Sequence, residues 1–345
     1  MHTAADERFM RLALAEARKG LGCTSPNPAV GAVLISAGKI IARGHHRGAG
    51  QPHAEVACLR SINTPIPKTA VLYITLEPCS TTGRTPPCTE AIIAAGIRHV
   101  VIGAIDVNPR HRGRGIKMLR AAGVDVRSGI MEQECMALNE MFNHWIQTKR
   151  PFVIAKCGLS LDGKLTRPSD ESQWITSAAA RAHANCFRSQ VDAILVGAET
   201  VRSDNPRLTV REVRTARQPW RVVMTRSGRL PKRANLFTDR YADRTLVFRD
   251  QTLPAVLAQL GEKEITSVLI EGGGDVLGQA LDARLIDRVQ IYLGPLLTGG
   301  PIVAFGARGA GSTAEAAHLR DVKYERIGSD IFLTGKPTYG NPPSE

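Results

Sequence analysis

Short apolar runs alternate with segments of helical periodicity along this chain, and the alternation starts again after Lys149-Arg150-Pro151. Repeated strand–helix alternation is typical of β-sheets that carry helices on both faces. The chain is 345 residues long, which exceeds the size at which a single hydrophobic core stops growing. We therefore expect two α/β domains, at residues 1–147 and 148–336, followed by a frayed tail at 337–345.

The apolar pattern also places the individual elements. In the first half we expect strands at 29–35, 39–44, 70–75, 99–105 and 124–127, and helices at 9–17, 53–62, 89–95, 115–122 and 132–147. In the second half we expect a strand from Phe152, further strands at 193–197, 221–225, 245–248, 267–271 and 288–293, and helices at 177–190, 254–260 and 275–284.

Two kinds of sequence signal bear on where the protein works. No stretch approaches the roughly 18–20 uncharged apolar residues needed to cross a bilayer. The N-terminus also lacks a basic region followed by an apolar core, so it does not resemble a signal peptide. The seven cysteines are an odd number scattered through the chain, which argues against a disulfide framework and leaves room for metal binding. We expect a cytoplasmic protein without a membrane partner.

The formal net charge is +13, and the excess of Lys and Arg is shared by both halves of the chain. The densest basic segment is Arg110-His111-Arg112-Gly113-Arg114, with Lys117 close behind. Such a segment is either a solvated loop or a surface that attracts a phosphorylated small molecule or a polyanion. Because there is no basic tail, we favour the solvated loop and expect no nucleic-acid partner.

Two short motifs in the first half predict a metal site. One is His53-Ala54-Glu55, and the other is Pro78-Cys79 followed, after eight intervening residues, by Pro87-Cys88. One imidazole and two thiolates supply three ligands for a tetrahedral zinc ion and leave the fourth position for water. Zinc lowers the pKa of such a water, which provides a nucleophile near neutral pH. We expect one zinc ion, held by His53, Cys79 and Cys88.

The glutamate of the first motif predicts catalysis rather than a purely structural zinc site. Glu55 follows His53 by two residues, so it is not spaced to be a further ligand on the same helix face. It is better placed to move a proton from the water to the leaving amine. This order of residues is typical of zinc nucleobase deaminases. A non-catalytic zinc-binding protein is the alternative, but it would not need Glu55.

The second half gives weaker signals when its residues are taken alone. Ile270-Glu271-Gly272-Gly273-Gly274 lies between an apolar strand and a helix, so it is either a tight turn or a phosphate-binding turn. It is not the G-x-G-x-x-G pattern, so a dinucleotide-binding Rossmann domain is not indicated. The run from Asp204 to Arg211 contains arginines that could hold a phosphate, although a solvated loop is favoured from these residues alone.

Several longer runs resemble the bifunctional riboflavin-biosynthesis deaminase–reductases over nearly the whole chain. In the first half they are Thr24-Ser25-Pro26-Asn27-Pro28-Ala29-Val30-Gly31, Gly50-Gln51-Pro52-His53-Ala54-Glu55 and the EPCSTTGRTPPC segment from Glu77 to Cys88. The eight residues between the cysteines are the most specific feature, because deaminases of free cytidine or tRNA adenosine usually have only two there. In the second half they are Lys156-Cys157-Gly158-Leu159-Ser160-Leu161-Asp162-Gly163-Lys164, Glu171-Ser172-Gln173-Trp174-Ile175-Thr176, 192–201, 204–211 and 270–274.

The resemblance implies a fold and a reaction for each half. The N-terminal domain would be a cytidine-deaminase-like three-layer α/β/α domain, and the C-terminal domain an α/β domain similar to dihydrofolate reductase. The first would deaminate 2,5-diamino-6-ribosylamino-4(3H)-pyrimidinone 5′-phosphate, and the second would reduce the ribosyl chain with NADPH to give 5-amino-6-ribitylaminouracil 5′-phosphate. A homo-oligomer, either a dimer or a tetramer, is also implied.

The resemblance further implies roles for particular residues. In the deaminase, Asn27, His46 and Arg84 would contact the pyrimidine or its ribose phosphate. In the reductase, the substrate would contact Ser172, Arg188, Leu208, Arg211 and Glu271. NADPH would face Gly158, Trp174, Thr200, Asp204, Gly273 and Gly274. The roles of Lys156 and Asp162 stay open between orienting the substrate and maintaining the architecture of the site.

Two departures from the family pattern are visible. Ser80-Thr81-Thr82 stands where the family usually has Ser, His and a second His or an aromatic residue, which concerns substrate positioning and not the zinc ligands. Thr225-Arg226 stands where Asp-Ser is common, so Arg226 either contacts the 2′-phosphate of the cofactor or points to solvent. These departures leave open a related enzyme acting on another pyrimidine or pteridine in secondary metabolism. A nucleic-acid base deaminase is the weaker alternative, because it would not account for the second half.

Overall fold

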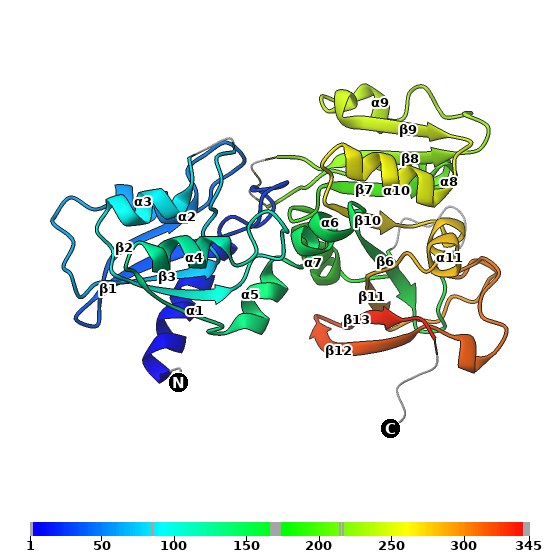
Figure 1. Ribbon diagram of the computed structural model, residues 1–345. Coiled ribbons are helices and arrows are strands. Elements are labelled where there is room, and N and C mark those ends of the chain that lie inside the picture. The colour runs from blue at the N-terminus through cyan, green and yellow to red at the C-terminus, as the bar shows by residue number, and fades with distance from the viewer. Residues whose placement is uncertain (1–2, 84–85, 166–173, 214, 216, 341–345) are drawn as a thin grey trace. The chain divides into compact units, whose positions relative to one another are not determined.

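The computed structural model describes residues 3–83, 86–165, 174–213, 215 and 217–340. The chain divides into two compact units, Met1–Lys149 and Arg150–Glu345, so the division lies beside the boundary expected at 147. Each unit contains its own sheet (Figure 1). Each unit also has its own hydrophobic core. Among the helices that the structure describes, none combines the length and the apolar character needed to cross a membrane.

The first unit is built on a five-stranded sheet in the order β2-β1-β3-β4-β5 (Figure 1). β1 is antiparallel to β2 and β3, whereas β3, β4 and β5 are parallel. The strands are β1 (Gly31–Ser36), β2 (Lys39–His45), β3 (Val71–Leu76), β4 (His99–Ala104) and β5 (Asp125–Ser128). The helices are α1 (Ala4–Arg18), α2 (Ala54–Arg60), α3 (Cys88–Ala94), α4 (Arg114–Ala121), α5 (Glu132–Leu138) and α6 (Glu140–Thr148).

Two glycines show that helices cover both faces of this sheet. Gly44 pairs with Ala32, and opposite residues in a sheet point to the same face, so Gly31 and Gly44 point to opposite faces. A Cβ atom at Gly31 would lie 2.1 Å from the Ala13 carbonyl oxygen of α1. A Cβ atom at Gly44 would lie 2.3 Å from the Cys58 nitrogen of α2. Close packing of α1 and α2 on opposite faces therefore requires glycine at both positions and produces three layers.

The single helix expected at 132–147 is wrong, because the chain breaks at Asn139 into α5 and α6. The Asn139 side chain is buried and pairs with the backbone of Ala29. Its Oδ1 accepts from the Ala29 N–H at 2.8 Å, and its Nδ2 donates to the Ala29 carbonyl at 2.9 Å. These two bonds satisfy backbone groups that no strand partner satisfies, which favours the break over a continuous helix.

The second unit is built on an eight-stranded sheet in the order β12-β13-β11-β6-β10-β7-β8-β9 (Figure 1). The strands from β11 to β9 are parallel, and β13 is antiparallel to both of its neighbours. The strands are β6 (Phe152–Ser160), β7 (Ala193–Gly197), β8 (Trp220–Thr225), β9 (Thr245–Arg249), β10 (Ser267–Glu271), β11 (Arg288–Gly294), β12 (His318–Ile327) and β13 (Asp330–Thr338). The helices are α7 (Ala178–Arg188), α8 (Ala198–Asp204), α9 (Asn235–Thr238), α10 (Leu253–Glu262) and α11 (Gly274–Asp282), with short 3₁₀ turns at Ala242–Arg244 and Thr313–Glu315.

The strand pattern did not predict β12 and β13, which form one edge of this sheet. Most residues of β12 are exposed, and the register shifts between Arg320 and Lys323, so the strand lacks a regular apolar alternation. The prediction that the chain frays from residue 337 is wrong for the first residues of this tail, because Thr338 pairs with His318 in the sheet. The Tyr339 hydroxyl also donates to the Ile286 carbonyl oxygen at 3.2 Å. Helix α8 was likewise not predicted.

Candidate functional sites

The predicted zinc ligands come from three places near the ends of elements in the first unit. His53 immediately precedes α2, Cys79 lies in the loop after β3, and Cys88 is the first residue of α3. Their ligand atoms all lie within 4.8 Å of one another. The structure therefore brings together three side chains from segments that lie 26 and 35 residues from His53 in sequence.

The spacing of these atoms fits a tetrahedral zinc ion. The His53 Nδ1 atom lies 3.2 Å from the Cys88 sulfur and 3.5 Å from the Cys79 sulfur. Zinc bonds of about 2.3 Å to sulfur and 2.0–2.1 Å to nitrogen place tetrahedral ligands roughly 3.5–3.8 Å apart. Two thiols and one imidazole are also ligand types that zinc prefers. The donor set thus suits the metal that the sequence predicts.

The titratable groups around the cluster are strongly perturbed. Hydrogen bonds from the Cys88 thiol and from His53 lower the pKa of Cys79 to about 4. The same thiol pair raises the pKa of Cys88, because the two sulfurs lie close together and share a hydrogen bond. Burial raises the pKa of Glu55 to about 7, and the nearby Cys79 charge acts in the same direction. Glu55 is only 3% exposed and lies beside the ligands, as its sequence position predicts.

Asn27 and His46 lie next to the ligand His53. The Nδ1 atom of His46 is 3.1 Å from the Pro52 carbonyl oxygen, and its Nε2 is 3.2 Å from the Asn27 Nδ2 atom. Because a carbonyl oxygen only accepts, Nδ1 carries the proton and Nε2 accepts from Asn27. Burial lowers the pKa of His46, which favours this neutral form. The rings of His46 and His53 meet edge to face at 5.0 Å. Arg84 lies outside the described residues.

Sequence reasoning gave no role to Glu77, which supports the loop beside Cys79. Glu77 is buried, and its carboxylate accepts backbone N–H bonds from Asp106 at 3.3 Å, Gly113 at 2.9 Å and Ile116 at 3.3 Å. It thereby ties the start of α4 to the chain that enters the metal cluster. The only sequence signal for this role is an acidic residue directly after an apolar strand. The sequence does not indicate its partners, because they lie 29 to 39 residues further along the chain.

In the second unit, the predicted substrate residues Arg188 and Glu271 form a buried ion pair. Arg188 donates from Nε to Glu271 Oε1 at 2.6 Å and from Nη2 to Oε2 at 2.7 Å. Burial alone would raise the pKa of Glu271, but the charges of Arg188 and Lys156 lower it to about 2. The Lys156 ammonium lies 3.8 Å from the same carboxylate. Lys156 therefore belongs to the same charged cluster.

Leu208 and Arg211 lie on one loop that reaches this ion pair. Leu208 is buried in a left-handed conformation, with φ of 49°. The Arg211 side chain is exposed, while its backbone N–H donates to the Asn185 side chain at 3.1 Å. Arg188 also donates to the Thr209 carbonyl at 3.2 Å, which joins the loop to Glu271. Ser172 lies outside the described residues.

The glycine turn after β10 lies beside Thr200. Gly272 and Gly273 have positive φ angles of 89° and 73°, which glycine adopts without strain. A Cβ atom at Gly273 would lie 3.5 Å from the Thr200 hydroxyl, so a side chain there would fill the space that faces this hydroxyl. Gly274 packs against the Val303 carbonyl and begins α11. The turn therefore places the Thr200 hydroxyl beside two positive-φ glycines at the N-terminus of α11.

The other residues expected to face the cofactor are more scattered. Gly158 lies on β6, where a Cβ atom would be 3.1 Å from the Thr176 methyl group. Trp174 is 64% exposed, with the Arg181 guanidinium 4.9 Å from its ring centre. Asp204 is exposed and accepts from the Ser203 hydroxyl at 2.9 Å. The structure places Thr200 beside the glycine turn, whereas Gly158, Trp174 and Asp204 have the other neighbours given above.

Asp162 and Arg226 have different surroundings. The Asp162 carboxylate accepts from the Thr298 N–H at 3.2 Å and from the Gly299 N–H at 2.8 Å. Hydrogen bonds from Ser160 and from these backbone groups lower the pKa of Asp162 to about 2, so an architectural role is favoured. The Arg226 side chain is 87% exposed and lies 3.9 Å from Asp275 near the start of α11. This position is compatible with both roles left open for Arg226.

Comparison with protein families assigns each unit. The cytidine and deoxycytidylate deaminase zinc-binding region matches residues 3–104, and the RibD C-terminal domain matches residues 151–333. The riboflavin biosynthesis protein RibD of Bacillus amyloliquefaciens is 39% identical, with 97% of each chain aligned. The RibD protein of Escherichia coli strain K12 is 36% identical over 95% of this chain and 98% of its own.

Solved structures give the same result. RibD of Acinetobacter baumannii superimposes with a TM-score of 0.89 at 35% identity, covering 97% of this chain and 99% of its own. A Thermotoga maritima protein superimposes with a TM-score of 0.88 at 35% identity and the same coverage. That protein is described as a diaminohydroxyphosphoribosylaminopyrimidine deaminase and 5-amino-6-(5-phosphoribosylamino)uracil reductase. These matches confirm the fold expected for each unit.

Proposed function

Because the chain belongs to the RibD family of bifunctional riboflavin-biosynthesis deaminase–reductases, we propose that it acts on 2,5-diamino-6-ribosylamino-4(3H)-pyrimidinone 5′-phosphate. The first unit removes the 2-amino group, and the second unit reduces the ribosyl chain with NADPH. The observation that carries this proposal is the cluster of His53, Cys79 and Cys88 with the buried Glu55 beside it.

In the deaminase, His53, Cys79 and Cys88 hold zinc. When bound, zinc supplies the Lewis acidity that makes water a nucleophile near neutral pH. Glu55 accepts the proton of the attacking water and delivers it to the departing ammonia. Its burial beside the ligands supports this role, because a carboxyl in a dry site exchanges protons with the reacting groups and not with bulk solvent.

Asn27 and His46 orient the pyrimidine. His46 donates to the Pro52 carbonyl and accepts from the Asn27 side-chain NH2, so the Asn27 side-chain oxygen is the group proposed to accept from the substrate. An amino group of the pyrimidine would be the donor. Arg84 contacts the ribose phosphate in this proposal, on the strength of its motif position. The arrangement keeps the reacting carbon close to Glu55.

In the reductase, Arg188, Arg211 and Ser172 bind the phosphorylated substrate together with Leu208, while Glu271 keeps Arg188 in place. NADPH, when bound, supplies the hydride that reduces C1′ of the opened ribosyl chain. The protein contributes orientation and complementary charge. The cofactor is held by Gly158, Trp174, Thr200, Asp204, Gly273 and Gly274. The positive-φ glycines of the turn and the adjacent Thr200 hydroxyl, at the N-terminus of α11, support this assignment.

The test is an assay of the purified protein on the freshly prepared diaminopyrimidine ribosyl phosphate, with and without NADPH, in which products are identified by mass. We expect the deaminated product without NADPH, and the deaminated and reduced product with it. Detection of only the deaminated product in the presence of NADPH would reject the reductase assignment. Neither product from zinc-loaded protein would reject this substrate and favour another pyrimidine or pteridine.

Family membership also underlies two coarser proposals. We infer that the enzyme works in the cytoplasm and forms a homo-oligomer, either a dimer or a tetramer. Sedimentation equilibrium of the purified full chain measures the assembled mass. A mass equal to that of one chain at micromolar concentration would reject the oligomer.

A further inference from the structure

The loop formed by residues 205–211 has an unusual backbone in the second unit. It follows α8 directly and belongs to no strand, so no sheet neighbour satisfies its peptide groups. Asn205 and Leu208 both have positive φ angles, of 42° and 49°. A left-handed conformation is unfavourable for a residue with a side chain, and it persists only where the surroundings impose it. The loop is therefore held in place by groups outside it.

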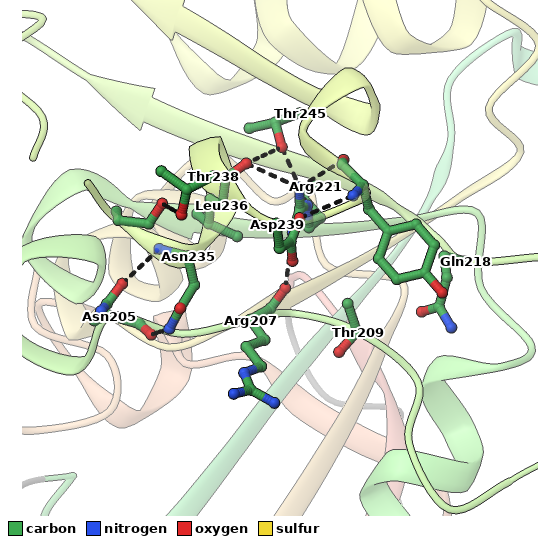
Figure 2. Close-up of polar contacts among 12 residues, drawn as sticks. Asn205, Arg207, Thr209, Gln218, Arg221, Asn235, Leu236, Thr238, Asp239 and Thr245 are labelled. Carbon is green, nitrogen blue, oxygen red and sulfur yellow. Dashed lines mark hydrogen bonds and ion pairs between the residues drawn. The ribbon is translucent and has the colours of Figure 1, made fainter. Parts of the chain in front are cut away.

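At the start of the loop, two asparagines pair reciprocally (Figure 2). The Asn205 Oδ1 atom accepts from the Asn235 backbone N–H at 2.8 Å, and the Asn235 Nδ2 atom donates to the Asn205 carbonyl at 2.7 Å. Asn235 is the first residue of α9. These two bonds fix the Asn205 peptide in its left-handed conformation, because both its side chain and its carbonyl are engaged.

Arg221 connects α9 to the loop (Figure 2). Its guanidinium, on β8, is 1% exposed and donates to the Arg207 carbonyl at 3.3 Å and to the Asp239 carboxylate at 2.7 Å. It also donates to the carbonyls of Leu236 at 2.8 Å and Tyr241 at 2.6 Å. A planar group with five donors can satisfy several acceptors at fixed angles, which a lysine cannot do. Arg221 thus holds the loop directly and also holds the segment that carries Asn235.

Three further side chains hold the second part of the loop. Gln218 accepts from the Val210 N–H at 2.7 Å and donates to the Val210 carbonyl at 3.2 Å, as a strand neighbour would. Asn185 accepts from the Arg211 N–H and donates to the Arg211 carbonyl. Arg188 donates to the carbonyl of Thr209. External side chains therefore bind the backbone at five of the seven positions from 205 to 211.

We propose that Gln218, Arg221 and Asn235 are positioning residues that fix this loop in advance for the phosphorylated substrate of the reductase. The inference rests on the proposed function, because Leu208 and Arg211 are substrate residues only if that function is correct. None of the three positioning residues was identified from the sequence.

The direction of the side chains supports positioning for a ligand. The network binds the backbone of Arg207, while the Arg207 and Arg211 side chains are exposed. In Figure 2 the Arg207 guanidinium extends away from the buried Arg221. The far end of the loop reaches Arg188, which pairs with Glu271. A rigid backbone that presents cations beside this pair lowers the entropy lost when an anionic substrate binds.

Steady-state kinetics of the reductase test the proposal, with the deaminated ribosylaminopyrimidine phosphate and NADPH varied separately on the full chain. For Gln218→Ala and Asn235→Ala we expect the KM for the phosphorylated substrate to rise about tenfold, the size expected for losing one or two hydrogen bonds. The kcat and the KM for NADPH should change by less than about twofold, because a binding interaction made equally in ground and transition states affects KM alone.

A second set of variants separates positioning from folding. Thr238→Ala is the matched control, since Thr238 lies on α9 but its hydroxyl bonds the Ala234 carbonyl of its own segment. Asn205→Asp keeps the acceptor for the Asn235 N–H and should stay near wild type, whereas Asn205→Ala should raise the KM. Arg221→Lys should raise the KM for the phosphorylated substrate most. It should also lower the midpoint of thermal unfolding, so its kinetics are compared with those of the milder variants.

Several outcomes of these measurements would overturn the proposal, and a further variant, Arg211→Ala, tests its premise. Lower kcat with unchanged KM in Gln218→Ala and Asn235→Ala would mean that these residues only stabilise the fold. A raised KM for NADPH alone would assign the loop to the cofactor. If Arg211→Ala raises the KM for the phosphorylated substrate while Gln218→Ala and Asn235→Ala do not, the positioning proposal is wrong and the proposed function stands. If Arg211→Ala leaves the KM unchanged, the substrate assignment itself fails.

Discussion

Glu55 in the first unit and Glu271 in the second are both buried site residues, and the two carboxyls differ in their charged neighbours. Glu55 is 3% exposed, and burial next to the Cys79 sulfur raises its pKa to about 7. Glu271 is 8% exposed, but Arg188 donates two hydrogen bonds to it and its pKa is about 2. The comparison teaches that burial alone does not set the charge of a carboxyl, because an adjacent cation reverses the effect.

The two glutamates also differ in the roles that the proposed function gives them. Glu271 pairs with Arg188 beside the loop at 205–211, so we propose that it orders the charged groups that bind the substrate. Among the residues that the structure describes, the side chains that act on the pKa of Glu55 are those of the three candidate metal ligands Cys79, His53 and Cys88. Under the proposed function, the first site would depend on a metal and a proton carrier, whereas the second would depend on a rigid charged surface.

Removing a metal ligand should have the largest effect and should separate the two units. For Cys79→Ala we expect bound zinc to be lost and deamination to fall below detection, because only two ligands remain. Reduction of the deaminated substrate by NADPH should continue, since its residues lie in the other unit. Metal analysis and both assays measure this. Cys23→Ser is the control, and a fully active zinc-free Cys79→Ala enzyme would remove the metal assignment.

Replacing the first glutamate tests its role directly. Glu55→Gln keeps the shape of the side chain but cannot exchange a proton, so deamination should fall by about 10²–10⁴-fold. Zinc content and reductase activity should stay unchanged. Glu16→Gln is a matched control, because Glu16 is another buried glutamate of the same unit that lies outside the metal cluster. A normal deamination rate in Glu55→Gln would contradict the proton-transfer role proposed for Glu55.

Removing the cation beside the second glutamate should destabilise the second unit. Arg188→Met leaves Glu271 buried without its main partner, which costs about 3–5 kcal/mol of unfolding free energy. Denaturant unfolding of the full chain, followed by a probe in the second unit, measures the loss. The double variant Arg188→Met with Glu271→Leu should recover most of it, because the uncompensated charge is gone. A loss below about 1 kcal/mol in the single variant would argue against a buried pair.

The Arg188–Glu271 ion pair should also make the unfolding free energy depend on pH in the acid range. The folded pKa of Glu271, about 2, lies below the ordinary value of 4.5, so the ionised carboxylate stabilises the fold above pH 4.5. This contribution, on the order of 3 kcal/mol, is lost as the pH falls from about 4.5 toward 2. Unfolding free energies measured from pH 5 to pH 2 should decline less steeply in Glu271→Gln. The exposed Glu262→Gln serves as control, and identical slopes for wild type and Glu271→Gln would contradict the assignment.

The smallest effect should come from an exposed ion pair at the start of α11. Arg226 and Asp275 are 3.9 Å apart and their side chains are 87% and 66% exposed. Arg226→Ala should therefore change the unfolding free energy by less than about 1 kcal/mol, in contrast to Arg188→Met. The same variant decides between the two roles left open for Arg226. A raised KM for NADPH but not for NADH would place it at the 2′-phosphate.

The sequence by itself determined the two α/β units, the metal cluster and the family. These features depend on local periodicity and on short motifs, such as His53-Ala54-Glu55, whose residues act together because a helix or a strand end fixes their spacing. The same local signals gave the strands that are buried and strongly apolar. They failed for β12, because an exposed edge strand needs no apolar alternation.

Only the tertiary structure decided how the sites are supported. The break at Asn139 depends on Ala29, which lies 110 residues away, and Glu77 depends on backbone groups beyond β4. Arg221 is a polar residue in an apolar strand, and its purpose is visible only when α9 and the loop at 205–211 lie around it. Hydrogen bonds between distant segments leave no periodic trace in the sequence, because their geometry exists only after the chain has folded.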